Sequence, residues 1–173
     1  MPYYIYVILL CEQLLIVFAF YLIFSWLTKT PFYPSSVKKL NRLIEEGKLI
    51  INEGDRFIDI GSGDGRFVIW AAKRNMYADG IEFNPFLTLL SRSKIVLNRV
   101  GNKARILNKN FNDHDYSGYD IAYLYIFTDH MDKIKDKLFK EMKPGSVIIT
   151  NTFTFTDIEP DDVYDRFNLY YVK

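Results

Sequence analysis

The sequence is poor in the residues that build metal centres and disulfide frameworks. Its 173 residues include one cysteine, Cys11, and two histidines, His114 and His130. A single cysteine excludes an internal disulfide and a multi-cysteine zinc site, and the two histidines are not spaced as a metal-binding pair, so we expect no metal. The formal net charge is only +1, which provides no strong field for nucleic acid, and we predict no nucleic-acid partner.

Charge is almost absent from the first 28 residues. None of the 22 Lys and Arg residues lies there, and Glu12 is the only one of the 21 acids that does. The apolar run from Tyr3 to Leu27 would form a helix of roughly 37 Å, longer than a hydrocarbon core of about 30 Å. We therefore predict a transmembrane anchor over residues 1–28, in which Glu12 costs about 3 kcal/mol. A helix buried in a soluble core is the alternative.

Basic residues follow this apolar run directly, at Lys29, Lys38, Lys39 and Arg42. By the positive-inside rule they predict a single-pass membrane protein whose body lies on the cytoplasmic side. Residues 29–47 are expected to form a linker and a short helix.

The remaining residues, 48–173, alternate between strand and helix patterns. The predicted strands cover residues 56–60, 78–82, 104–108, 120–126, 146–155 and 167–172, and the predicted helices cover residues 65–75, 85–98 and 129–142. Such alternation indicates an α/β domain with a Rossmann-like, doubly wound and mostly parallel sheet.

A glycine-rich loop, DIGSGDG at Asp59–Gly65, follows the first predicted strand and opens a helix. Glu82 ends the next strand at the offset where a carboxylate accepts the hydroxyls of a ribose. Arg66 replaces the third glycine of a dinucleotide fingerprint, and carboxylates at Asp59 and Asp64 would repel a pyrophosphate. These acids favour the cationic amino-acid end of S-adenosylmethionine, so we predict that cofactor; an NAD-dependent oxidoreductase is the alternative.

Several motifs resemble those of a known enzyme family. DIGSGDG, GIEFNP at Gly80–Pro85 and KPG at Lys143–Gly145 are similar to motifs of class I (seven-β-strand) methyltransferases. PFYPSS at residues 31–36, YLYIFTDHM at residues 123–131 and TNTFTF at residues 150–155 resemble a narrower group. That group contains the membrane-anchored mitochondrial and related prokaryotic protein-lysine N-methyltransferases, and the resemblance covers nearly the whole chain.

The resemblance also implies roles for individual residues. The methionine end of the cofactor is assigned to the glycine loop, its ribose to the turn after the second strand, its adenine to the segment after the third strand, and its cover to the linker. The methionine end is assigned to Asp59, Gly61, Ser62, Gly63 and Gly65, and the ribose to Glu82, Phe83 and Asn84. The adenine is assigned to Asn110 and Phe111, and the cover to Tyr33 and Ser35. Tyr125 and Phe127 are expected to face the methyl group, although aromatic residues at strand ends also serve as core.

The sequence departs from the family pattern in two places. The tail after Phe155 is too short for the usual last helix and two antiparallel strands, so we expect a shortened C-terminal edge of the sheet. No N-P-P-Y-type motif follows the fourth strand, which argues against methylation of nucleobase amines.

The chemistry implied by the cofactor requires positioning rather than covalent catalysis. The sulfonium already makes its methyl group electrophilic, so the protein must align an acceptor and exclude water. Deprotonating a lysine at pH 7 costs roughly 4.6 kcal/mol, and a desolvated aromatic channel lowers that cost. We therefore predict methylation of lysine side chains in proteins at or near a membrane, including membrane-embedded ones, and assign no general base. A lipid, quinone or other small hydrophobic acceptor, or a non-catalytic cofactor-binding membrane protein, is the alternative.

Overall fold

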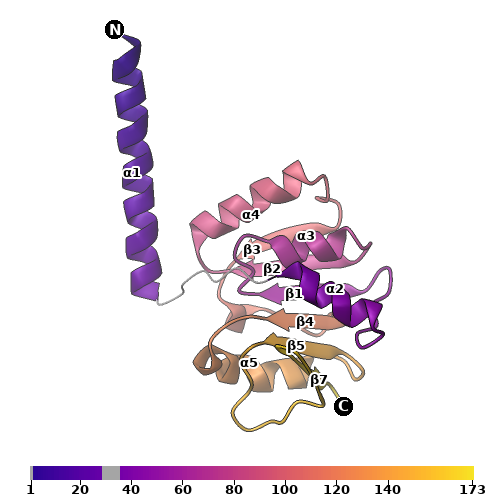
Figure 1. Cartoon of the computed structure of the whole chain (residues 1–173). Helices are drawn as coiled ribbons and strands as arrows, with labels where there is room; N and C mark the ends of the chain where they lie inside the picture. Colours follow the sequence, from indigo (N-terminus) through magenta and orange to yellow (C-terminus); the bar gives the residue numbers. More distant parts are fainter. Residues whose placement is uncertain (1, 29–35) are drawn as a thin grey trace. The chain divides into compact units, whose positions relative to one another are not determined.

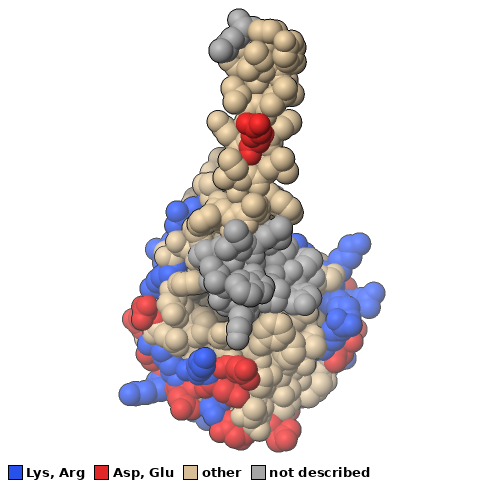
Figure 2. All heavy atoms as spheres, turned by 90° about the vertical axis from the view of Figure 1, so that its left-hand side faces the viewer, with Lys and Arg blue, Asp and Glu red and all other residues tan. Residues whose placement is uncertain are grey.

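The computed structural model describes residues 2–28 and 36–173, and the chain divides into two compact units, Met1–Tyr33 and Pro34–Lys173. The first unit is the helix α1 (Tyr3–Thr28), which Figure 1 shows as one continuous helix. Its segment Tyr3–Phe20 is long and apolar enough to cross a membrane, and none of that segment is buried. Figure 2 shows one acidic group and no basic group on the visible face of the helix, and Glu12 is the acidic residue of this segment in the sequence. This segment is therefore a candidate membrane-spanning helix.

The second unit is built on a seven-stranded sheet with the order β3-β2-β1-β4-β5-β7-β6. The strands are β1 (Arg56–Ile60), β2 (Tyr77–Glu82), β3 (Ala104–Asn108), β4 (Ile121–Leu124), β5 (Val147–Asn151), β6 (Asp162–Tyr164) and β7 (Phe167–Tyr171). Strands β1 to β5 pair in parallel, whereas β7 is antiparallel to both β5 and β6. This topology confirms the predicted doubly wound, mostly parallel sheet.

Helices cover both faces of this sheet (Figure 1). The helices α2 (Val37–Glu45), α3 (Arg66–Ala72) and α4 (Pro85–Leu97) contribute to the core on one face. The helix α5 (Thr128–Glu141) packs on the other face. The short 3-10 helix η1 (Phe111–Asp113) and the segment that leads into β4 contribute to the same core. The central strands β4 and β5 are buried on both sides, which explains their nearly continuous apolar sequences.

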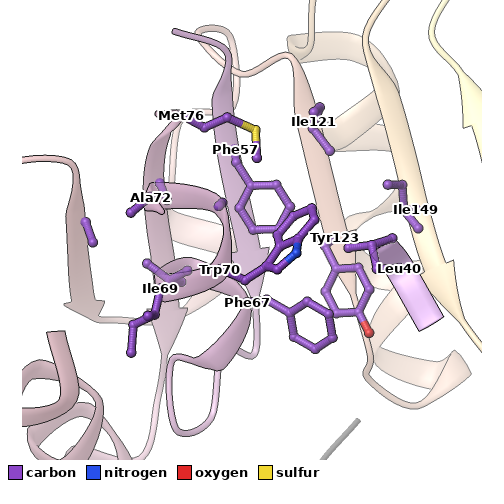
Figure 3. Packing of buried hydrophobic residues seen from close by; sticks show 14 of the residues in the cluster. Leu40, Phe57, Phe67, Ile69, Trp70, Ala72, Met76, Ile121, Tyr123 and Ile149 are labelled. Atoms are coloured by element: carbon purple, nitrogen blue, oxygen red, sulfur yellow. The ribbon is translucent and has the colours of Figure 1, made fainter. Parts of the chain in front are cut away.

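Aromatic side chains fill the first of these cores, as Figure 3 shows. Phe67 of α3 stacks on Tyr123 of β4 with ring centroids 4.3 Å apart, and Trp70 meets Phe57 edge to face at 5.9 Å. The indole of Trp70 donates a 2.7 Å hydrogen bond to Asn41 Oδ1 of α2, and Leu40 of the same helix is fully buried. The helix α2 is therefore part of the domain core.

A second buried network fixes β2 to β3 on the opposite face. The carboxylate of Asp79 pairs with Arg105 of β3 and accepts a hydrogen bond from the hydroxyl of Tyr119, which also contacts His114 Nε2 at 3.0 Å. Burial by itself would raise the pKa of Asp79, but the hydrogen bonds from Arg105 and Tyr119 outweigh it and lower that pKa. Asp79 is therefore held ionised.

The structure corrects three of the predicted elements. The helix predicted to reach residue 75 ends at Ala72, and the residue at position 75 then adopts a positive φ. The strand predicted over residues 120–126 spans only Ile121–Leu124. The strand predicted over residues 146–155 ends at Asn151, because Thr152 takes a φ of 70° and turns the chain out of the sheet.

The C-terminal edge is shortened in a different way from the one expected. Both antiparallel strands, β6 and β7, are present, so a loss of strands is wrong. What is missing is a helix between β5 and β6, since the described residues 152–161 contain none. The short tail suffices because β6 has only three residues and a tight turn at Asp165, with a φ of 54°, leads into β7.

Candidate functional site

The predicted site residues gather at the carboxyl ends of β1, β2, β3 and β4. Ile60 of β1 pairs with Ile81 of β2 and with Leu124 of β4, and Glu82 pairs with Asn108 of β3. Because these strands are parallel and in register, the segments that follow them emerge at one edge of the sheet, where ligands bind in open α/β folds. The two predicted cover residues, Tyr33 and Ser35, lie outside the described residues.

The glycine loop is pressed tightly against its neighbours. The backbone N–H groups of Gly61 and Ser62 both donate to Ile81 O at 2.9 Å. Gly61 has a φ of 79°, and a Cβ at this position would lie 2.8 Å from Ile126 Cγ2. The loop therefore requires glycine, both for its left-handed backbone and for the space around it.

The remaining loop residues also pack toward the protein. Gly65, with a φ of 75°, would bring a Cβ within 2.8 Å of Ser91 Cβ on α4. The side chain of Ser62 lies beneath the loop against Gly80, and its Oγ is buried without a hydrogen-bond partner among the described residues. From Gly61 to Gly65, the loop therefore offers a ligand mainly its backbone.

Glu82 holds the loop and the following turn together. Its Oε2 accepts a 2.8 Å hydrogen bond from Gly63 N, and its Oε1 accepts a 2.7 Å hydrogen bond from Asn84 N. Asn84 Oδ1 in turn caps α4 by accepting from Phe86 N at 2.9 Å. The carboxylate is thus fixed in position at the end of β2 before any ligand arrives.

Asn108 is a site residue that the sequence reasoning missed. Its Nδ2 donates to Glu82 O at 2.9 Å and to Phe83 O at 3.1 Å, and so fixes the turn that carries the Glu82 carboxylate. The available signal was its position, since a polar residue that ends β3 lies directly beside the end of β2. Phe83, which was predicted to flank the ribose, is 51% exposed in this turn.

Two buried carboxyl groups dominate the electrostatics of the site. Asp59 is only 3% exposed, and burial, with further repulsion from Glu82 and Asp64, holds its pKa well above the usual range; Arg66 opposes this. Burial also raises the pKa of Glu82, although hydrogen bonds from the backbone of Asn84 and Gly63 counteract it. A cation bound beside these groups would relieve the unfavourable burial of their negative charge.

Asp64 does not share this role, which corrects the prediction from the sequence. Burial would raise its pKa, but Arg66 donates to its two oxygens at 2.8 and 2.9 Å, Lys94 Nζ contacts it at 2.5 Å, and its pKa is lowered. Its charge is therefore already compensated by two cations. The negative character of the loop comes from Asp59 and Glu82.

The predicted adenine-bordering residues lie after β3 as expected. Asn110 is exposed, and its Oδ1 caps η1 by accepting from Asn112 N at 3.0 Å. Phe111 is half-buried against the second core and meets His130 edge to face at 6.2 Å. Asn110 thus has a structural turn role, whereas part of Phe111 remains accessible at the edge of the sheet.

Three aromatic side chains form a cluster after β4 and β5, which we call the aromatic cluster: Tyr125, Phe127 and Phe153. Tyr125 stacks on Phe153 with centroids 6.2 Å apart, and Phe127 lies 5.4 Å from the same ring. Tyr125 is half-buried and Phe127 is 40% exposed, so neither is a fully buried core residue. Sequence reasoning missed Phe153 because it assigned that residue to the long strand.

The loop that carries Phe153 is fixed by polar side chains. Thr150 Oγ1 donates a 2.6 Å hydrogen bond to Phe153 O, and Asn168 Nδ2 of β7 donates to the same oxygen at 3.2 Å. The C-terminal strand therefore helps to position the aromatic cluster.

The arrangement fits S-adenosylmethionine better than a metal or a dinucleotide. Within residues 2–28 and 36–173, no group of three or more metal-ligating side chains could hold an ion. The glycine backbone presents no side chain at Gly61, Gly63 or Gly65, and the buried Asp59 and Glu82 suit a cationic amino-acid end and ribose hydroxyls but oppose a pyrophosphate.

Sequence relatives agree with this geometry. The family described as the ANTKMT methyltransferase domain matches residues 59–162. A protein-lysine N-methyltransferase from Saccharolobus islandicus is 30% identical over 141 residues, which cover 80% of this chain and 86% of that protein. A human lysine N-methyltransferase, whose name gives ATP synthase as the source of its substrate, is 30% identical over 133 residues, which cover 77% of this chain and 56% of the human protein, a little more than half of its length.

Solved structures share the fold. An RNA methyltransferase from Salinibacter ruber, in complex with S-adenosyl-L-homocysteine, has a TM-score of 0.74 over 81% of this chain and 94% of its own, at 24% identity. At that identity the likeness shows the fold, while the family match rests on the sequence. The chain belongs to the ANTKMT methyltransferase domain family and is a class I S-adenosylmethionine-dependent methyltransferase.

Proposed function

We propose that this protein transfers the methyl group of S-adenosylmethionine to lysine side chains of proteins at or near a membrane. The observation that carries the proposal is the aromatic cluster, which lies at the same sheet edge as the buried Asp59 and Glu82. The names of the archaeal and human relatives, both lysine N-methyltransferases, support a lysine acceptor.

The cofactor would be held mainly by acids and by backbone. Asp59 is placed to attract the ammonium group of the methionine end, and the loop from Gly61 to Gly65 allows close approach to its backbone. Glu82 still has acceptor capacity for ribose hydroxyls, because its carboxylate offers about four acceptor positions and the backbone of Gly63, Phe83 and Asn84 uses three of them. When bound, the cofactor supplies an electrophilic methyl group on a positively charged sulfur.

The other predicted contacts remain part of this proposal. Phe83 and Asn84 lie beside Glu82, Asn110 and Phe111 border the adenine, and Tyr33 and Ser35 belong to the cover.

The aromatic cluster supplies the environment that a lysine acceptor requires. A lysine amine must lose its proton to attack, and an apolar surrounding favours the neutral amine by raising the free energy of the ammonium form. The faces of Tyr125, Phe127 and Phe153 can also hold the cationic methylated product. These residues orient the acceptor and exclude water, and no general base is assigned.

The helix α1 supports a membrane location for this reaction. It is apolar on all sides, and Lys38 and Arg42, both exposed, follow it on the domain side. We infer a single-pass anchor that places the domain on the cytoplasmic side of the membrane. An acceptor at or in that membrane would then be held at a high local concentration.

A transfer experiment tests the proposal. The full chain is incubated with methyl-labelled S-adenosylmethionine and solubilised membranes, and labelled residues are identified by mass spectrometry. Label on protein lysines is expected, with loss of labelling in Phe153→Ala and retention in the control Tyr77→Ala, an exposed aromatic at the amino end of β2.

Two results would contradict the proposal. Label found only in an organic extract would indicate a lipid, quinone or other small hydrophobic acceptor. Cofactor binding without any transfer would indicate a non-catalytic protein.

A further inference from the structure

The helix α4 carries apolar side chains on its solvent side as well as on its core side. Leu87 and Ile95 pack toward the sheet, whereas Leu89 is 66% exposed, Val96 73% and Leu97 80%. Ordinary surface helices are polar on the side that faces water. The outer side of this helix therefore exposes Leu89, Val96 and Leu97 to solvent in the described part of the domain.

The apolar residues on the outer side of the helix lie on one face, where the exposed Ser93 is the polar residue between them. The half-buried Phe86 and the exposed Leu89, Leu90, Val96 and Leu97 follow the three- and four-residue spacing of one helix face, opposite the buried positions. With Phe83 just before the helix, this face contains half of the large apolar side chains that are exposed in residues 36–173. We refer to the residues Phe83, Phe86, Leu89, Leu90, Val96 and Leu97 as the α4 stripe.

The sequence segment that contains α4 carries charge of one sign. Residues 83–112 contain no Asp or Glu, and their six bases are Arg92, Lys94, Arg99, Lys103, Arg105 and Lys109. Asp64 and Asp79, from other segments, pair with Lys94 and Arg105, so four bases have no acidic partner among the ion pairs of the described residues. Exposed Leu, Val and Phe flanked by basic residues are the pattern of a helix that lies in an anionic membrane surface.

A short stretch of sequence links the proposed anchor to the domain. Only eight residues separate Thr28 from Val37, and even a fully extended chain of that length spans only about 32 Å. An anchored domain would therefore meet the bilayer surface at a high effective concentration. The helix α2, where the connection ends, covers the same face of the sheet as α4.

We propose that the α4 stripe docks on the surface of an anionic membrane and orients the methyl-transfer edge toward it. The inference rests on the membrane anchor of the proposed function. Because α4 begins at Pro85, three residues after Glu82, docking would place the beginning of the helix and the cofactor turn near the lipid headgroups. A membrane-embedded acceptor would then meet the aromatic cluster at that level.

A second copy of the chain is a poorer occupant for this surface. A symmetric contact would place the same basic segment on both sides, and the like charges would repel. Anionic lipid headgroups instead complement that charge while the stripe enters the interface.

Site-directed spin labelling of the full chain tests the proposal. Single cysteines replace Leu89, Leu97, Val17 or Val163 in a Cys11→Ser background, and each is labelled with a nitroxide in vesicles of phosphatidylcholine and phosphatidylglycerol. Val163 is the matched control, because it is apolar and 57% exposed but lies on β6, at the opposite edge of the sheet from β3. Collision with oxygen reports contact with lipid, and collision with a water-soluble nickel chelate reports contact with water.

We expect oxygen to dominate at Leu89 and Leu97 and the nickel chelate to dominate at Val163, with a shift toward the chelate at Leu89 in pure phosphatidylcholine. Water-like accessibility at Leu89 and Leu97 equal to that at Val163 would overturn the inference. Dipolar broadening between nitroxides at Leu89 would identify a second copy and would also overturn it. The label at Val17 reports the anchor separately, so a failure of α4 docking is distinguishable from a failure of the anchor.

Discussion

Replacing Asp59 by asparagine is expected to stabilise the free protein while weakening its hold on the cofactor. The carboxyl group is buried and has a raised pKa, so the folded state favours its protonated form. Its contribution to stability is therefore fully present below the ordinary pKa of an aspartate, about 4, and is lost as the pH rises toward the raised value. Asparagine removes this loss because it cannot ionise.

The size of the effect follows from the burial of Asp59. Each unit by which the pKa is raised corresponds to about 1.4 kcal/mol, and effective penalties for a buried ion reach several kcal/mol. We expect Asp59→Asn to raise the unfolding free energy at pH 8 by about 1–3 kcal/mol, or the Tm by roughly 3–10 °C. Loss of a charge-assisted contact should weaken S-adenosylmethionine binding roughly 10- to 100-fold.

Asp79→Asn provides a matched control with the opposite sign. Asp79 is also a buried aspartate, on the neighbouring strand, but hydrogen bonds from Arg105 and Tyr119 outweigh burial and lower its pKa. Its contribution is present above about pH 4 and is lost as the pH falls through the lowered value. Because Arg105 is largely exposed, the substitution should destabilise by only about 1–2 kcal/mol at pH 8 and leave cofactor affinity unchanged.

Thermal unfolding of the full chain in detergent, from pH 4 to pH 9, measures the stability of both variants. Calorimetric titration with the cofactor measures their affinity for it. The reasoning would be refuted if Asp59→Asn were less stable than the natural protein at pH 8. It would equally be refuted if Asp59→Asn bound the cofactor with undiminished affinity.

Three further substitutions probe the site. Glu82→Gln should weaken binding of S-adenosylhomocysteine about tenfold by calorimetry, because a neutral amide is a poorer acceptor for ribose hydroxyls; unchanged affinity would contradict the ribose assignment. Gly65→Ala should lower the unfolding free energy by about 1–3 kcal/mol more than Gly145→Ala does, and thermal unfolding should show a correspondingly lower Tm. Both positions have a positive φ, but an added Cβ meets a side chain at 2.8 Å only in the first case, and equal losses would show that crowding is unimportant. Phe153→Leu should reduce kcat for lysine methylation at least tenfold with cofactor affinity intact, whereas an unchanged kcat would exclude Phe153 from the acceptor site.

Local sequence patterns predict the first half of the domain well. The strand that ends at Ile60, the glycine loop and the strand that ends at Glu82 are each marked by a continuous apolar run or by residues that tolerate a tight turn. Asn84 and the proline after it mark the start of α4 in the same way, and the structure shows the side-chain cap. In each case the cause of the structure lies within a few residues of its effect.

The aromatic cluster shows where such patterns stop. Alternating Thr and Phe continue the strand pattern past Asn151, yet the strand ends there and Phe153 turns toward Tyr125. Asn168, far along the chain, holds that turn through Phe153 O. No local pattern contains this information, because it depends on the pairing of β5 with β7.

The prediction that Asp64 adds negative charge to the site is wrong for a similar reason. Its partner Lys94 lies 30 residues further along the chain and reaches it only because α4 packs beside the loop. The sequence shows two acids in the loop, but the negative charge that remains uncompensated at the site comes from the buried Asp59 and its neighbour Glu82. The prediction of the cofactor stands on those two residues and on the glycine backbone.

The most direct test of the account compares two ligands on two proteins. S-adenosylmethionine and 5′-methylthioadenosine, which lacks the amino-acid end, are titrated into the full chain and into Asp59→Asn. If Asp59 recognises the cationic end, the natural protein should prefer S-adenosylmethionine strongly, and most of that preference should vanish in the variant. An equal preference in both proteins, or binding of NADH in place of S-adenosylmethionine, would contradict the account.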